Sequence, residues 1–446
     1  MHADVRTITE LARQIRAGTL SAESATEQCL ARIAECDRDI NAFITVTADQ
    51  ARAQAREADR ELEAGRDRGP LHGVPISLKD LIDMRGTPTT AASRVRAGHV
   101  ATTDALVTTR LREAGAVFVG KTNLHEFAFG TTNEDSAYGP VHHPLDVTRS
   151  PGGSSGGSAA SVLAGMAYAS IGTDTGGSIR IPSSVCGLVG LKPHLGEIPI
   201  DGVVPLSTLL DHVGPLCRSV EDAGIVYHAL RGVTNPPPIR ARDVAGLRLG
   251  VPQPYFMDLL DEDVRAAFDA MLQRLSRAGA AIEDVAIPHA SYAPPIYVHL
   301  ALPEAAAYHA PTLESQPDDY SAPVRLRIET GRYILAEDYV RALHGREALI
   351  ADVNAALAGR DGLLLPTMTI PAQKLGATTV SLGGTEEPVR NAMLRLTQPF
   401  NITGHAAISI PCGKTREGLP IGAQIVASQT AAVLEIAAAL ERPLEQ

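Results

Sequence analysis

The chain has 446 residues, of which 44% are hydrophobic and 20% charged, the balance of a globular protein that can build a large core. Its formal net charge is −11, and the sequence contains no basic run or basic–aromatic patch. Both features argue against nucleic-acid binding. The five cysteines are scattered without a CxxC pair, so we expect unpaired, buried side chains in a reducing compartment.

The N-terminal residues are charged and lack an apolar signal region. The longest apolar run, residues 159–172, is too short and too rich in small side chains to cross a bilayer. We therefore expect a cytoplasmic protein without a membrane partner.

The first predicted elements are helices over residues 7–65, with Ser21 as an N-cap. The sequence VPISLKD (74–80) then changes period, because apolar residues alternate with other side chains. This alternation predicts a short strand with Lys79 on the face opposite its valine, isoleucine and leucine.

Further along, helix-like and strand-like segments alternate, which predicts an α/β architecture with helices on both faces of a mixed sheet. We expect one domain over residues 1–446, with 1–70 as its N-terminal helical segment, and a surface connection at NPPPIR (235–240). The predicted helices are 105–115, 156–170 and 261–279, and the predicted strands are 116–120, 187–192, 247–251, 362–367, 406–411 and 421–427.

The stretch SPGGSSGGSAAS (150–161) has the composition of a flexible linker, yet a linker would not lead directly into apolar, weakly charged sequence. A phosphate-binding loop has the right glycine spacing here, but Ser158 stands where its lysine belongs. A nucleophile elbow, GxSxG, is matched by GSSGG with Ser155 as nucleophile, and downstream histidines leave that hypothesis open.

A fourth interpretation combines this stretch with GTDTGGSIR (172–180) and with Lys79 upstream. Together these segments resemble the amidase signature family, over most of the chain from near residue 5 to near residue 426. The segments that carry the resemblance are GVPISLKDLIDMRGTPTTAAS (73–93), VGKTNLHEFAFG (119–130), SPGGSSGGSAASVLAG (150–165) and GTDTGGSIRIPSSVCGLVGLKP (172–193). The resemblance implies an α/β/α sandwich with a large, mixed, twisted sheet.

The resemblance implies a catalytic triad in which Ser178 is the nucleophile, Ser154 relays a proton and Lys79 is the base. The chemistry is consistent with these roles, because a serine hydroxyl needs an adjacent base and neither serine motif contains a histidine. Lysine serves as a base only when neutral, and burial among apolar neighbours lowers its pKa from about 10.4. In the family, the serine corresponding to Ser154 follows a cis peptide bond, so we expect a cis Gly153–Ser154 bond.

The loop TDTGGS would supply backbone N–H groups to an oxyanion, because its glycines leave the approach open. The predicted oxyanion-hole residues are Thr175, Gly176, Gly177 and Ser178. Ser155 is expected to support the Ser178 segment, and Asp174 and Arg180 are expected supports that equally fit a buried structural ion pair. Gly130 and Thr131 are candidate substrate-binding residues.

The implied activity is hydrolysis of a small amide or carbamate, urethanase-like in the second case, through an acyl- or carbamoyl-enzyme. The alternative is the glutaminase subunit of a tRNA-dependent amidotransferase, but residues 290–345 and the C-terminus do not resemble those subunits, which favours a hydrolase that acts alone. No cofactor or metal is expected, since no HExxH pattern exists and His142 and His143 fit a loop. We expect a monomer or homodimer, with the irregular segment 374–391 as a mobile flap.

Overall fold

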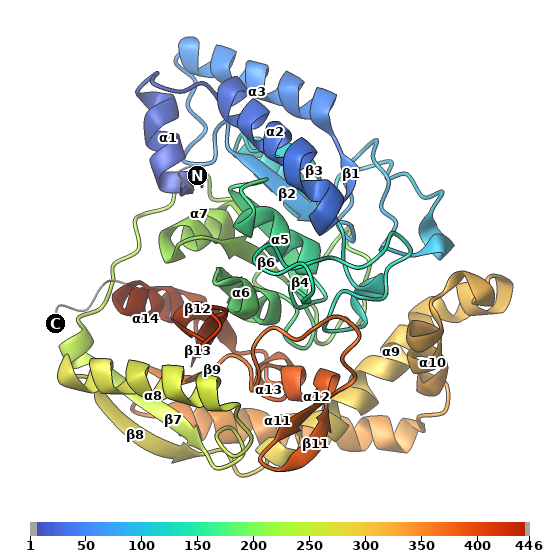
Figure 1. Ribbon diagram of the computed structural model, residues 1–446, viewed down its shortest axis with the longest axis vertical. Helices are drawn as coiled ribbons and strands as arrows, with labels where there is room; N and C mark the ends of the chain where they lie inside the picture. Colours follow the sequence, from blue (N-terminus) through green and yellow to red (C-terminus); the bar gives the residue numbers. More distant parts are fainter. Residues whose placement is uncertain (1–6, 442–446) are drawn as a thin grey trace.

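The computed structural model describes residues 7–441, and a mixed sheet of eleven strands runs through it (Figure 1). The strand order is β1-β3-β2-β4-β6-β5-β12-β13-β9-β7-β8, with parallel pairs around β2 and β7 and antiparallel pairs elsewhere. The strands are β1 (Phe43–Val46), β2 (Pro75–Lys79), β3 (Val117–Thr122), β4 (Ala169–Asp174), β5 (Val189–Lys192), β6 (His212–Cys217), β7 (Arg248–Gln253), β8 (Ala281–Ala286), β9 (Gly362–Pro366), β12 (Ala406–Lys414) and β13 (Pro420–Ala427).

Helices pack on both faces of this sheet, because its central strands are apolar on both sides. In β9, for example, Leu364 belongs to one hydrophobic cluster, and Leu363 and Leu365 belong to another. The first cluster includes residues of α8 (Glu262–Arg277) and α14 (Thr430–Glu441), and the second includes residues of α11 (Ala336–Leu357) and α13 (Gln398–Ile402). The α/β class and the sandwich of helices around a large mixed sheet are therefore confirmed.

The helices include long amphipathic segments and short ones near the sheet. Ser21 is the N-cap predicted from the sequence, since its Oγ accepts a hydrogen bond from Ser24 N at 3.0 Å. The helices are α1 (Ile8–Arg16), α2 (Ala22–Ile40), α3 (Ala48–Glu63), α4 (Leu106–Glu113), α5 (Gly156–Leu163), α6 (Arg180–Cys186), α7 (Val220–Leu230), α8 (Glu262–Arg277), α9 (Ala293–Ser315), α10 (Ala322–Gly331), α11 (Ala336–Leu357), α12 (Val389–Leu394), α13 (Gln398–Ile402) and α14 (Thr430–Glu441).

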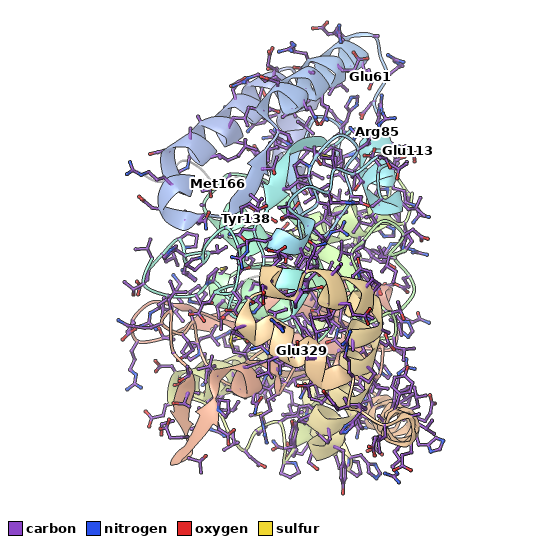
Figure 2. The ribbon with its side chains drawn as sticks, turned by 90° about the vertical axis from the view of Figure 1, so that its right-hand side faces the viewer. Glu61, Arg85, Glu113, Tyr138, Met166 and Glu329 are labelled. Atoms are coloured by element: carbon purple, nitrogen blue, oxygen red, sulfur yellow. The ribbon has the colours of Figure 1, made fainter. Side chains whose placement is uncertain are left out.

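Helices α2 and α3 pack together beside β2 and β3 at the upper end of the molecule, whereas α9 and α10 project from its right-hand side (Figure 1). In the side view, Glu61 of α3 lies near the upper end, and Glu329 of α10 lies on the face turned toward the viewer (Figure 2).

Several local predictions were wrong. Strand β1 interrupts the predicted helical region 7–65, and the predicted helix 156–170 ends at Leu163 because Gly165 adopts a φ of +78°. Strand β4 follows directly, although its small residues resemble the preceding helix. The segment 374–391 is not irregular, since it contains a two-stranded hairpin of β10 (Thr379–Leu382) and β11 (Thr385–Pro388).

None of the five cysteines forms a disulfide, as predicted. Among the described residues, no group of histidine, cysteine and acidic side chains is arranged to hold a metal ion. Within the same part of the chain, no helix is both long and apolar enough to span a membrane.

Candidate active site

Lys79, the last residue of β2, is completely buried. Its Nζ donates to Ser154 Oγ and to Thr173 Oγ1, each at 2.8 Å. The predicted alternation of β2 is confirmed, because Ile76 and Leu78 face a hydrophobic cluster whereas Ser77 contacts the hydroxyl of Ser161 in α5 at 3.1 Å. Both faces of the strand are buried, so Lys79 lies inside the protein and not at a solvated strand end.

Burial lowers the pKa of Lys79 to about 7, although Asp174 and Asp211 partly oppose the shift. No carboxylate forms an ion pair with this amine within residues 7–441. A large share of Lys79 is therefore neutral near pH 7, which a base requires.

Lys121 shows what a partner changes. This second fully buried lysine forms an ion pair with Asp80 at 2.9 Å. Burial still lowers the pKa of Lys121, but the Asp80 charge opposes that shift by direct contact. Lys192 is also fully buried without a carboxylate partner among the described residues, and its amine donates to the Pro193 and His405 carbonyls. The contact with a serine hydroxyl therefore distinguishes Lys79 from both other buried lysines.

Ser154 lies two residues before the first residue of α5, and the Gly153–Ser154 peptide bond is cis, as predicted. The backbone of residues 131–133 packs directly against Gly153, where a Cβ atom would lie 2.9 Å from Asn133 N and 3.0 Å from the carbonyl carbon of Thr131. Ser154 is fully buried, and its carbonyl accepts from His125 N at 3.1 Å. Glycine at 153 is thus a packing requirement of the segment that presents Ser154.

Ser178 lies in the loop that connects β4 to α6, and 5% of its surface is exposed. Ser155 N donates to the Ser178 carbonyl at 3.3 Å, and Ser155 Oγ donates to the Thr173 carbonyl at 3.2 Å. Ser155 therefore links the two serine segments by hydrogen bonds, and its supporting role in catalysis stays a prediction. This use of its hydroxyl leaves the nucleophile-elbow hypothesis without support.

The loop before Ser178 presents unpartnered backbone donors. Within the described chain, the N–H groups of Gly176, Gly177 and Ser178 donate no hydrogen bond. Gly177 has a φ of +144°, a conformation that favours glycine, and a Cβ atom there would lie 2.3 Å from Thr397 Oγ1. The geometry suits an anion-binding turn of the kind predicted.

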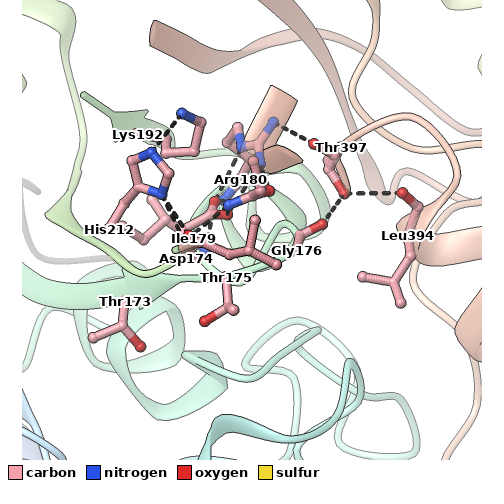
Figure 3. A network of polar contacts seen from close by, with 12 residues as sticks. Thr173, Asp174, Thr175, Gly176, Ile179, Arg180, Lys192, His212, Leu394 and Thr397 are labelled. Atoms are coloured by element: carbon pink, nitrogen blue, oxygen red, sulfur yellow. Dashed lines mark hydrogen bonds and ion pairs between the residues drawn. The ribbon is translucent and has the colours of Figure 1, made fainter. Parts of the chain in front are cut away.

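Two side chains hold this loop in place. Thr175 Oγ1 donates to Asp211 Oδ1 at 2.6 Å, so this predicted oxyanion-hole residue uses its side chain as an anchor. From the other side, Thr397 Oγ1 donates to the Gly176 carbonyl at 2.6 Å (Figure 3). Burial raises the pKa of Asp211 to about 6, although hydrogen bonds from Thr175 and from the backbone partly lower it.

Asp174 and Arg180 form a fully buried ion pair at 3.0 Å at the two ends of the same loop. Arg180 also donates to Gln424 Oε1 and Asn401 Oδ1, each at 2.6 Å. Burial alone would raise the pKa of Asp174, but the Arg180 charge holds it below its usual range. Figure 3 shows this network beside Thr175 and Gly176 of the loop, with Lys192 and His212 to its left. The pair therefore has the structural role that the sequence left open, at the base of the Ser178 loop.

Replacing Arg180 by methionine is expected to lower the free energy of unfolding by about 3–5 kcal/mol, because Asp174 would remain charged and buried without its partner. Chemical denaturation monitored by circular dichroism would measure this loss. Arg416→Met is the matched control, since its ion pair with Asp263 is solvent-screened and its loss should hardly change the free energy of unfolding. Equal stability of the two variants would contradict the role assigned to the buried pair.

Gly130 and Thr131, the candidate substrate-binding residues, are both buried. Gly130 packs against the His125 ring, where a Cβ atom would lie 2.0 Å from its Nε2. The backbone of Thr131 lies against Gly153, next to Ser154. Both residues are therefore near the site, and their binding role stays a prediction.

Sequence reasoning missed Thr173, Asp211 and Thr397. Thr173 lies inside the GTDTGGS motif, so its spacing could have identified it. Asp211 and Thr397 lie in segments without a local signal, and only the fold brings them to the loop.

Residues 24–432 match a family model described as amidase. The A subunit of a glutamyl-tRNA(Gln) amidotransferase from Koribacter versatilis (strain Ellin345) is 38% identical over 486 residues, which cover 100% of this chain and 99% of the relative. An amidase from Pseudomonas putida is 40% identical over 427 residues, which cover 93% and 90% of the two chains. A solved structure described as an amidase has a TM-score of 0.93, with 37% identity over 98% of this chain and 99% of that one.

The fold and these similarities define an enzyme that acts on C–N bonds. The chain belongs to the amidase signature family, as its motifs implied. The comparisons favour the alternative, the A-type subunit, over a hydrolase that acts alone, because A subunits of amidotransferases align with 100% and 98% of this chain at 38% identity.

Proposed function

We propose that the protein hydrolyses amides through Ser178, with Ser154 as proton relay and Lys79 as base. The observation that carries the proposal is the 2.8 Å contact between Ser154 Oγ and a buried lysine amine whose pKa is about 7. In the reactive state, Lys79 is neutral and accepts the Ser154 proton, and Ser154 accepts the proton of Ser178.

The attack of Ser178 Oγ on the amide carbon forms a C–O bond and places negative charge on the carbonyl oxygen. The three unpartnered N–H groups of Gly176, Gly177 and Ser178 are the donors for this oxyanion. When the C–N bond breaks, the proton held by Lys79 returns through Ser154 to the leaving nitrogen. Water then attacks the acyl-enzyme by the same relay, and the acid is released.

The amide itself stays open between two proposals. The names of the curated relatives favour the glutaminase subunit, whose ammonia would pass to a partner protein. The Pseudomonas putida amidase and the TM-score of 0.93 to an amidase favour a hydrolase that needs no partner. Nothing in these similarities favours a carbamate, so urethanase activity is the weakest form of the proposal.

A substrate panel tests these proposals. We expect the isolated protein to release ammonia from at least one primary amide, measured by a coupled glutamate dehydrogenase assay. Turnover of glutamine that rises strongly on addition of amidotransferase partner subunits, ATP and glutamyl-tRNA would select the glutaminase function. Amine release from an anilide or a carbamate without partners would select the independent hydrolase, and no turnover under either condition would contradict amide hydrolysis.

A further inference from the structure

A cavity of about 240 Å³ lies next to the Ser178 loop. Tyr297 and Leu394 line it and also border Gly176, where a Cβ atom would lie 3.1 Å from Tyr297 Oη and from Leu394 Cδ2. Leu382, from the hairpin of β10 and β11, also lines the cavity. A cavity of this size and place suits the part of a small substrate that does not react.

The cavity contains two arginines with different surroundings. Arg395 is already engaged, because its guanidinium stacks 3.9 Å from the centre of the Tyr255 ring and donates to the Tyr255 carbonyl. Arg390 differs, since its Nε is buried without a hydrogen-bond partner, and no ion pair joins it to any residue between 7 and 441. Glu387 also lines the cavity but makes no contact with Arg390 that would neutralise it.

The electrostatic surroundings do not compensate Arg390. Burial lowers the pKa of its guanidinium, and burial followed by the charge of Arg390 lowers the pKa of Arg327. The guanidinium of Arg327 donates a hydrogen bond to the Phe129 carbonyl at 2.7 Å. Arg390 as a whole is half-buried, with its Nε buried and its charge unpaired within the described residues, so a bound anion would compensate that charge.

Tyr297 offers a second donor to the same cavity. Burial raises the pKa of Tyr297 to about 12, so its hydroxyl keeps its proton at neutral pH. Within the described residues this hydroxyl makes no hydrogen bond. A planar guanidinium matches a carboxylate in two parallel hydrogen bonds, and the phenol adds a further donor.

We propose that Arg390 binds a carboxylate of the substrate, so that the substrate class is an amide acid with its carboxylate at the end away from the scissile amide. Because the whole chain carries a formal charge of −11, attraction of an anion must come from such a local group. The proposal rests on the amide hydrolysis proposed above and adds the substrate class.

The experiment compares amides of equal shape and different charge. Succinamate and glutaramate carry a carboxylate, and 4-methylpentanamide and 5-methylhexanamide replace it by an isopropyl group. L-glutamine is included because it adds an ammonium to the same carbon chain. Ammonia release is measured for the wild type, Arg390→Gln, Arg390→Lys and the exposed control Arg416→Gln.

We expect the wild type to prefer at least one amide acid over its neutral isostere. Arg390→Gln should lower kcat/KM for that acid by about 10- to 100-fold, mainly through KM, and leave the neutral isostere unchanged. Arg390→Lys should recover part of the preference, and Arg416→Gln should match the wild type. Equal losses on acid and isostere, or a preference that survives Arg390→Gln, would overturn the proposal.

Calorimetry with Ser178→Ala separates this proposal from the proposed reaction. Binding of glutaramate or succinamate that disappears in the Ser178→Ala, Arg390→Gln double variant supports the carboxylate site even if the wild type releases no ammonia. Absence of binding of both acids to Ser178→Ala, or binding unchanged by Arg390→Gln, overturns it. L-glutamine, used as a third ligand, shows whether the added ammonium is accepted.

Discussion

Replacing Ser178 by alanine is expected to lower kcat/KM by about 10⁴- to 10⁶-fold on any amide that the protein hydrolyses. The loss is large because Ser178 is the proposed nucleophile and lies in the loop whose three N–H groups donate no hydrogen bond within the described residues. Ammonia release under single-turnover conditions would measure it, together with mass spectrometry of the acyl-enzyme formed by the wild type.

Ser183→Ala is the matched control for this prediction. Ser183 lies five positions further along the chain, in α6, and its buried hydroxyl has no partner among the described residues. Its removal should leave turnover unchanged. If Ser178→Ala keeps wild-type turnover, or if the acyl group is found on another residue, the proposed mechanism is wrong.

Replacing Lys79 by methionine is expected to lower kcat by about 10²- to 10⁴-fold, the contribution typical of a general base. Lys79→Arg should be equally inactive, because a guanidinium stays charged and cannot accept the Ser154 proton. Steady-state kinetics of both variants, beside circular dichroism spectra, would separate lost chemistry from lost folding. Substantial activity of Lys79→Arg would contradict the role of base.

The pH dependence tests the same residue without a mutation. Since the pKa of Lys79 is about 7, kcat/KM of the wild type should fall about tenfold for each pH unit below 7 and reach a plateau above it. A neutral amide is the substrate, so that its own ionisation does not contribute. A flat profile between about pH 5.5 and 8.5 would contradict this assignment.

The same pKa predicts how stability changes with pH. Lysine in the unfolded chain holds its proton up to 10.5, whereas Lys79 in the folded protein loses it near 7. Between these values the unfolded state binds more protons, so the contribution of Lys79 to stability rises with pH. In Lys79→Met this rise should disappear, and denaturation at pH 7 and pH 10 would measure the difference.

The sequence alone identified the elements of this site that are encoded locally. The alternation around Lys79 depends on strand geometry within five residues, and the GGSS and TDTGGS segments keep their serines and glycines at fixed spacing. Their resemblance to one family then implied the sandwich fold, the cis Gly153–Ser154 bond and the family itself. The roles of Lys79, Ser154 and Ser178 in catalysis remain predictions for the experiments above.

Local patterns failed where several structures share one composition. The small residues after Leu163 suit a helix as well as a buried strand, so the predicted helix 156–170 extended to the start of β4 and the strand itself was not predicted. Strand β6 contains Pro215, a residue that ordinarily argues against an interior strand. In both cases, pairing with neighbouring strands outweighs the local preference.

Only the tertiary structure decided which groups meet. Parallel pairing of β2 with β4 brings Lys79 to Thr173, although 94 residues separate them. Arg180 reaches Asn401 across 221 residues, and Arg390 remains unpaired beside the cavity. The physical reason is that periodicity and spacing reflect the local backbone, whereas burial, pKa and the absence of a partner depend on distant segments packed around each group.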